Sequence, residues 1–115
     1  MAFTDQEHEL SAEQVRDLLA SGEIVLVDVR EPYEWDAGRI PGAVHIELER
    51  LPSRAEEIPH DRKVVFQCRL GVRSAMATQA FRASGWDAYN LGGGIQAWAD
   101  RGLPLEPAGG YVAEH

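Results

Sequence analysis

The chain has 115 residues, 44% of them apolar and 26% charged, and its 19 acidic and 11 basic residues give a formal net charge of −8. This length predicts a single domain, and no run approaches the roughly 18 apolar residues of a membrane span. The negative charge argues against general binding to nucleic acid, so neither nucleic acid nor a membrane is an expected partner.

The first predicted elements are a helix and a buried strand. Ser11 and Gln14 have the spacing of a capping box, and apolar residues follow at helical spacing, which predicts a helix over 12–20. Residues 24–29 form a run rich in β-branched side chains, typical of a strand buried on both faces. Such strands occur in parallel sheets that helices cover.

The later elements alternate between strands and helices. They are a short helix from Pro32 to Trp35, a turn at 41–42, a strand over 43–46, a weak helix over 48–58, a strand over 63–67, a helix over 73–84, a strand over 87–91 and a helix over 95–100. This alternation predicts an open α/β sheet with right-handed crossovers. Residues 107–115 are expected to form a flexible tail.

Three segments lie at the carboxyl ends of predicted strands, where ligands bind in open α/β sheets. They are residues 28–30, the loop that begins at Cys68, and the glycines at 92–94. We expect these segments to line one pocket. The glycine run lacks the Gly-Lys-Ser/Thr ending of a phosphate-binding loop, which favours a tight strand-to-helix turn.

Cys68 is the only cysteine of the chain and lies between a predicted strand and a predicted helix. A thiolate in this position is stabilised by N–H groups at the helix start and by the charges of Arg69 and Arg73. Gly71 lets the backbone curl, so that N–H groups can point inward around a small anion. Free cysteine is often buried and inert, but this combination favours a reactive nucleophile.

The same cysteine bears on location. It cannot form an internal disulfide, and a single thiol is most useful where the surroundings keep it reduced. Residues 1–7 are acidic and lack the basic start and apolar core of a signal peptide. The sequence therefore predicts a cytoplasmic location.

The segment from Cys68 to Ser74 resembles the active-site loop of rhodanese-like sulfurtransferases, in which four residues separate the cysteine from a closing position often held by Arg. Further segments resemble that family's other landmarks in the same order: 28–31, 38–43 (with Arg39 in place of the usual His), 91–98 and 102–105. The resemblance implies one rhodanese-like domain over residues 1–106, followed by the tail at 107–115. It also implies a central, mostly parallel five-stranded sheet with helices on both faces.

The resemblance implies a sulfurtransferase of the thiosulfate:cyanide type. Such a protein takes sulfane sulfur from a small anionic donor, thiosulfate or a persulfide, and holds it as a persulfide on Cys68. It then passes the sulfur to a thiophilic acceptor: a thiol, cyanide or a protein. No cofactor is needed, and the scattered histidines predict no metal site.

The residues expected to serve this chemistry lie in two segments. The expected substrate-binding residues are those of the loop after the nucleophile, namely Arg69, Leu70, Gly71, Val72 and Arg73. Ser74 is expected to support the loop, and so are Asp28 and Arg30, for which bracing is the more ordinary role. Leu70 replaces a second basic residue of thiosulfate-specialised relatives, which keeps a persulfide donor open as the alternative.

Two other functions remain open from the sequence. Cysteine-dependent phosphatases also use a loop between Cys and Arg, but they place five residues there, whereas Cys68 and Arg73 enclose four. A phosphatase also needs a carboxylic acid to protonate the leaving oxygen, and none can be assigned. The other alternative is a non-catalytic or carrier module that delivers sulfur to a protein partner.

Overall fold

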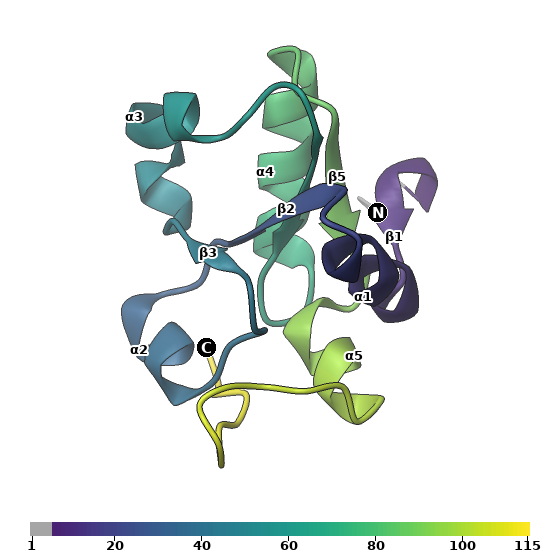
Figure 1. The fold of residues 1–115 in the computed structure, drawn as a ribbon. Helices are drawn as coiled ribbons and strands as arrows, with labels where there is room; N and C mark the ends of the chain where they lie inside the picture. Colours follow the sequence, from purple (N-terminus) through teal and green to yellow (C-terminus); the bar gives the residue numbers. More distant parts are fainter. Residues whose placement is uncertain (1–5) are drawn as a thin grey trace.

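The computed structural model describes residues 6–115, and its sheet confirms the predicted α/β class. Residues 1–5, part of the stretch predicted to carry no signal peptide, lie outside this range. Within it, the strands pair in parallel throughout, in the order β1-β5-β4-β2-β3 (Figure 1). Their bounds are β1 (Glu9–Leu10), β2 (Ile24–Asp28), β3 (Val44–His45), β4 (Lys63–Gln67) and β5 (Ala88–Leu91). Of these strands, only β1 is not predicted from the sequence, because a segment of two residues is too short to show the alternation of a strand.

The helices follow the predicted order. Their bounds are α1 (Ala12–Ala20), α2 (Pro32–Ala37), α3 (Leu51–Arg54), α4 (Val72–Ala83) and α5 (Gly94–Asp100), with short 3-10 turns η1 (Gln6–His8), η2 (Leu48–Arg50) and η3 (Ala55–Glu57). The weak helix predicted over 48–58 is therefore divided between η2, α3 and η3. Pro52 explains part of this division, because it has no N–H group to continue a helix from η2.

Helices cover both faces of the sheet, as predicted (Figure 1). On one face, Leu51 of α3 and Phe81 of α4 pack with Phe66 of β4. On the other face, residues of α1 and α5 pack with Val65. Because neighbouring residues of a strand point to opposite faces, β4 contributes to both cores, and such side chains stabilise the fold by about 1.5–3 kcal/mol each. No helix within residues 6–115 is long and apolar enough to cross a membrane.

The C-terminal segment lies against α2. Figure 1 shows it passing from the end of α5 toward α2. Arg39 and Glu106 exchange backbone hydrogen bonds of 2.9 Å, and the Tyr111 N–H donates to the Ala37 carbonyl at 3.0 Å. Gly38 permits this approach, because a Cβ there would overlap the backbone of Tyr111. The flexibility expected of 107–115 stays a prediction.

The capping box predicted for the first helix is confirmed at α1. The Gln14 N–H donates to Ser11 Oγ at 3.1 Å, and the Ser11 N–H donates to Gln14 Oε1 at 2.8 Å. Ser11→Ala is expected to lower the free energy of unfolding by about 1 kcal/mol in urea denaturation, because one N–H at the helix start loses its partner. Ser53→Ala, in an exposed serine that caps no helix start, is the control, and an equal loss in both variants would contradict the prediction.

Candidate active site

Cys68 lies immediately after β4, at the carboxyl end of the sheet, and is 1% exposed. Its Sγ accepts hydrogen bonds from the N–H of Gly71 at 3.1 Å and the N–H of Ser74 at 3.4 Å. Gly71 has a φ of 101°, a left-handed conformation that favours glycine, and it caps the start of α4. The sulfur thus lies in a backbone cradle at a helix start, where a negative charge is stabilised. Ser74 lies one position beyond residues 69–73, which were expected to bind the substrate, and its backbone N–H also donates to the sulfur.

The turn after β5 supports this loop from outside. The N–H groups of Ile95 and Gln96, at the start of α5, donate to the carbonyls of Cys68 and Arg69 at 2.9 and 3.0 Å. Gly94 packs so closely that a Cβ there would overlap the backbone of both residues. The structure therefore brings the segments at 68–71 and 92–94 together, and the glycine run is a turn that touches the loop.

Arg73 is held in place by a buried carboxylate. Its Nη1 and Nη2 donate to Oε1 and Oε2 of Glu34 at 2.9 and 3.1 Å, and the Glu34 side chain is fully buried. Burial raises the pKa of Glu34, but hydrogen bonds from Arg73 and the Glu31 N–H, with the Arg73 charge, outweigh it and hold the pKa below its usual range. Arg73 is thereby a fixed cation beside the loop.

The pKa of Arg73 depends on Glu34 and on the nearby Cys68 sulfur. Burial lowers the pKa of Arg73, but the hydrogen bonds and charge of Glu34, together with a charge on Cys68, outweigh it and raise the pKa above its ordinary value. The charged form of Arg73 is therefore favoured by Glu34 first and, to a smaller extent, by the neighbouring Cys68 and Asp28. Glu34 comes from α2 and was not among the residues expected at the site from the sequence.

Asp28 and Arg30 form a second ion pair, with both side chains fully buried. Arg30 Nη2 donates to Asp28 Oδ2 at 2.8 Å and to the Gly38 carbonyl at 2.8 Å. These contacts tie the end of β2 to the segment after α2, which is a bracing arrangement. The Val29 N–H donates to the Gln67 carbonyl at 3.0 Å and joins this segment to the strand that carries Cys68.

The mouth of the loop is apolar. Leu70 is 55% exposed and Val72 is 68% exposed, and Met76 of α4 is 56% exposed beside them. A groove of about 290 Å³ runs along this rim and is lined by Glu9, Leu70, Gly71, Val72, Ala75, Met76 and Gln79. Arg69 is half-buried, and its Nε has no hydrogen-bond partner among the described residues. The groove is mainly apolar, although Glu9 and Gln79 also line it, and Cys68 itself is not among its lining residues.

Ser74 and Asn90 complete the surroundings of the sulfur. The single hydroxyl proton of Ser74 can be donated either to Cys68 Sγ, at 3.3 Å, or to Asn90 Oδ1, at 2.6 Å. Asn90 comes from β5 and was not expected at the site. A polar residue in an otherwise buried strand was the available signal, because such a side chain needs hydrogen-bond partners.

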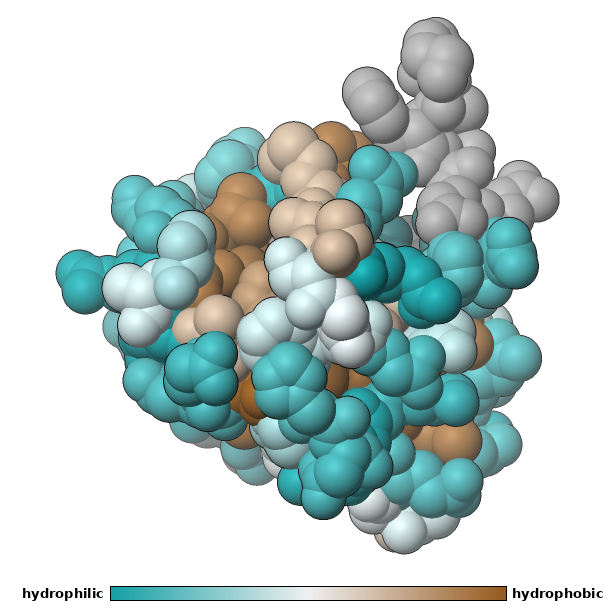
Figure 2. Space-filling model, turned by 90° about the horizontal axis from the view of Figure 1, so that it is seen from above, coloured by the Kyte–Doolittle hydropathy of each residue, from teal (hydrophilic) through white to brown (hydrophobic). Residues whose placement is uncertain are grey.

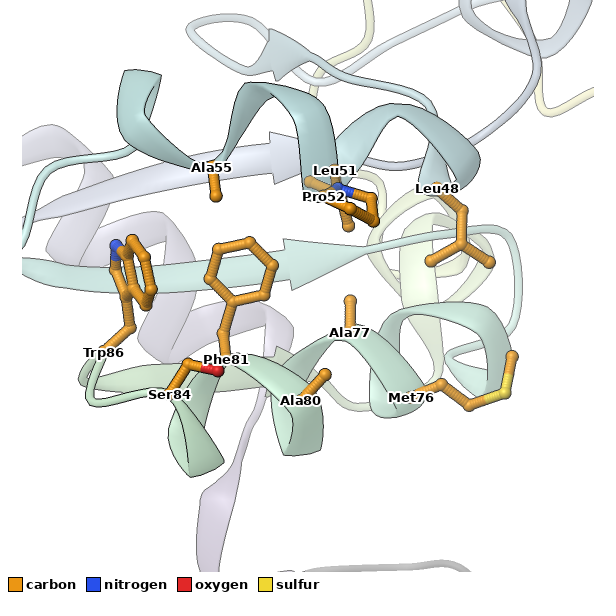
Figure 3. Close-up of a pocket in the computed structure, with 10 residues that line it drawn as sticks. All are labelled: Leu48, Leu51, Pro52, Ala55, Met76, Ala77, Ala80, Phe81, Ser84 and Trp86. Atoms are coloured by element: carbon orange, nitrogen blue, oxygen red, sulfur yellow. The ribbon is translucent and has the colours of Figure 1, made fainter.

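A larger groove lies between α3 and α4, with a volume of about 510 Å³. In Figure 3, Phe81 and Ala77 point from α4 toward the facing segment, which carries Leu51 and Ala55. From above, Figure 2 shows an apolar area framed by hydrophilic side chains on the side where α3 and α4 lie. None of the lining residues is titratable, and Ser84 is the only one with a hydroxyl group. The residues that line this groove are Leu48, Leu51, Pro52, Ala55, Met76, Ala77, Ala80, Phe81, Ser84 and Trp86.

Comparisons with known proteins identify a family that has this fold. The family model described as the rhodanese-like domain matches residues 11–101. A protein of Allochromatium vinosum named sulfurtransferase is 42% identical over 100 residues, which cover 85% of this chain and 94% of that protein. The crystal structure of a rhodanese-related protein from Thermoplasma volcanium has a TM-score of 0.80 at 27% identity and covers 86% of this chain and 97% of its own. That of a rhodanese-like domain protein from Staphylococcus aureus has a TM-score of 0.76 at 30% identity, covering 86% and 98%.

Proposed function

The chain belongs to the rhodanese-like domain family and is a sulfurtransferase, and we propose that it carries sulfane sulfur as a persulfide on Cys68. The observation that carries this proposal is the position of the Cys68 sulfur. This sulfur accepts hydrogen bonds from two backbone N–H groups at the start of α4, and the fixed charge of Arg73 lies beside the same loop. These groups stabilise a thiolate before reaction and an anionic group after it.

In the first step the Cys68 thiolate attacks the outer sulfur of the donor. With thiosulfate, a bond forms between Sγ and this sulfur, the sulfur–sulfur bond of thiosulfate breaks, and sulfite leaves with the electron pair. The negative charge then lies on the outer sulfur of the persulfide. The N–H groups of residues 69–73 and the charges of Arg69 and Arg73 bind the anionic donor in this proposal.

In the second step an acceptor removes the outer sulfur. A nucleophile such as cyanide or a thiolate bonds to it, the Sγ–sulfur bond breaks, and the electron pair returns to Cys68 as a thiolate. The exposed side chains of Leu70, Val72 and Met76 favour partners with apolar surface. This rim supports the second candidate, a carrier that exchanges sulfur with a protein. A reducing compartment such as the cytoplasm keeps the thiol available for either role.

The loop length is the main argument against phosphate chemistry. Four residues separate Cys68 from Arg73, fewer than the five of the phosphatase loop. Glu34, the carboxylate nearest to Arg73 in this arrangement, is bound on both oxygens and has a lowered pKa. A carboxylate in that state is a poor acid for a leaving oxygen.

Intact mass tests the proposal directly. Reduced protein treated with thiosulfate, or with a low-molecular-weight persulfide, is expected to gain the mass of one sulfur. Cyanide is expected to remove that mass and to yield thiocyanate. Cys68→Ser is expected to gain nothing, because the hydroxyl is not ionised near neutral pH.

The outcomes separate the functions. Uptake without release to cyanide or small thiols favours the carrier. No uptake from either donor overturns the proposal, and turnover of an aryl phosphate that requires Cys68 would replace it with the phosphatase.

A further inference from the structure

Asn90 lies beneath the Cys68 loop with its side-chain amide bonded at both ends. The residue belongs to β5 and is 3% exposed. Its Nδ2 donates to the Gly71 carbonyl at 3.1 Å, and its Oδ1 accepts from Ser74 Oγ at 2.6 Å. Ser74 is fully buried, so water does not replace either bond.

The direction of the Ser74 hydroxyl follows from these contacts. The Gly71 carbonyl can only accept a hydrogen bond, so the NH₂ group of Asn90 must face it. The amide oxygen therefore faces Ser74, and it cannot donate. Because two oxygens 2.6 Å apart need a proton between them, the single hydroxyl proton of Ser74 points toward Asn90.

This leaves a lone pair of Ser74 Oγ facing the Cys68 sulfur, at 3.3 Å. A neutral thiol fits that arrangement, because its S–H can donate to the oxygen. A thiolate does not fit it, because a negative sulfur would face an oxygen lone pair. The hydroxyl could turn toward a thiolate only by giving up its buried bond to Asn90.

We propose that Asn90 is a positioning residue that holds the Ser74 hydroxyl away from Cys68 and thereby favours an uncharged Sγ over a thiolate. The inference rests on the proposed function, in which Sγ is charged only between rounds of transfer. In the persulfide the charge lies on the outer sulfur and the inner sulfur is uncharged. Asn90 therefore favours the sulfur-loaded protein over the unloaded thiolate.

The charged groups around the sulfur stay the same when Asn90 is replaced. They come from every element near the loop: His8 of η1, which lines a small cavity with Asn90, Glu9 of β1, Asp28 at the end of β2 and Arg30 just after it, Glu34 of α2, Arg69 of the loop and Arg73 of α4. The start of α5 contributes backbone N–H groups to the loop carbonyls. A difference in the reactivity of Cys68 between variants at Asn90 and Ser74 therefore reports the effect of the Ser74 hydroxyl on the sulfur.

Alkylation by iodoacetamide provides the test, because Cys68 is the only cysteine and only its thiolate reacts. The rate is measured across pH for the native protein, Asn90→Leu, Ser74→Ala and the double variant. Asn90→Leu is expected to react about fivefold faster near neutral pH and to reach half its maximal rate at lower pH, since the freed hydroxyl can donate to the thiolate. Ser74→Ala is expected not to slow the reaction. The double variant is expected to match Ser74→Ala.

Two results would overturn the inference. A several-fold slower reaction in Ser74→Ala would mean that the native hydroxyl already serves the thiolate, and this variant decides the question even where Asn90→Leu does not fold. A faster reaction of Asn90→Leu that persists without the Ser74 hydroxyl would mean that Asn90 acts by another route. Alkylation needs no sulfur donor, so these results are independent of whether the protein takes up sulfur.

Discussion

Gly94→Ala is expected to lower the free energy of unfolding by about 3 kcal/mol or more and to displace the loop that carries Cys68. Gly94 has a φ of 64°, which strains any other residue. Its added Cβ would also overlap the backbone of Cys68 and Arg69, and backbone cannot turn aside as a flexible side chain can. The two costs add, and the second acts directly on the site. Urea denaturation measures the stability, and persulfide formation measures the site.

Gly102→Ala is the matched control for this variant. Gly102 has a similar φ of 72°, but a Cβ there would meet nothing within 4 Å. The loss of unfolding free energy in Gly102→Ala therefore measures the backbone strain alone, which is about 1 kcal/mol. Equal losses in the two variants, with full sulfur uptake in Gly94→Ala, would show that the close approach to the loop does not matter.

Glu34→Gln is expected to cost about 3 kcal/mol of stability and to slow sulfur transfer by about tenfold or more. The substitution removes the charge that balances Arg73 and turns an NH₂ group toward its donors. The stability figure lies at the low end for a broken buried pair, because the Arg73 side chain is 17% exposed. The transfer rate falls because the freed guanidinium no longer has a fixed place beside Cys68.

The pH dependence of stability distinguishes this pair from an ordinary contact. The pKa of Glu34 is lowered in the folded protein from an ordinary value of 4.5, so its contribution is present above that pH and is lost as the pH falls through the folded value. The native protein should therefore lose more stability between pH 7 and about pH 3.5 than Glu34→Gln does. Glu57→Gln, in the exposed pair with Arg54, should leave both the stability and its pH dependence nearly unchanged. An identical acid response in the native protein and Glu34→Gln would contradict the role of the pair.

The sequence predicts those parts of the fold that carry a local pattern. The capping box at Ser11 and the buried strand that ends just before Cys68 depend only on neighbouring residues, and the structure confirms both. The two-residue strand β1 has no such pattern, because it forms only by pairing with β5. The weak helix predicted over 48–58 shows the opposite error, since the structure divides this stretch into three short helical segments and Pro52 lies in the first turn of the middle one.

The same distinction applies to the site. Cys68, Gly71 and Arg73 lie within six residues of one another, so their spacing alone predicts a cradle. Glu34 and Asn90 reach that cradle from α2 and β5, and nothing local indicates which side chain each will meet. Sequence reasoning finds the nucleophile and its loop, while the residues that orient the loop require the packing of the whole sheet.

The contacts at both ends of the Cys68 loop restrict how this protein can change. The start of α5 binds the carbonyls of Cys68 and Arg69, while Glu34 holds Arg73 at the other end. A phosphatase loop would need one more residue here. Contacts fix the loop at both ends, so an inserted residue could not be accommodated without moving one of these contacts. A mutational path from sulfur to phosphate chemistry would therefore have to alter the turn at 92–94 or α2 together with the loop. Engineering a wider loop in this chain should begin with those two supporting segments.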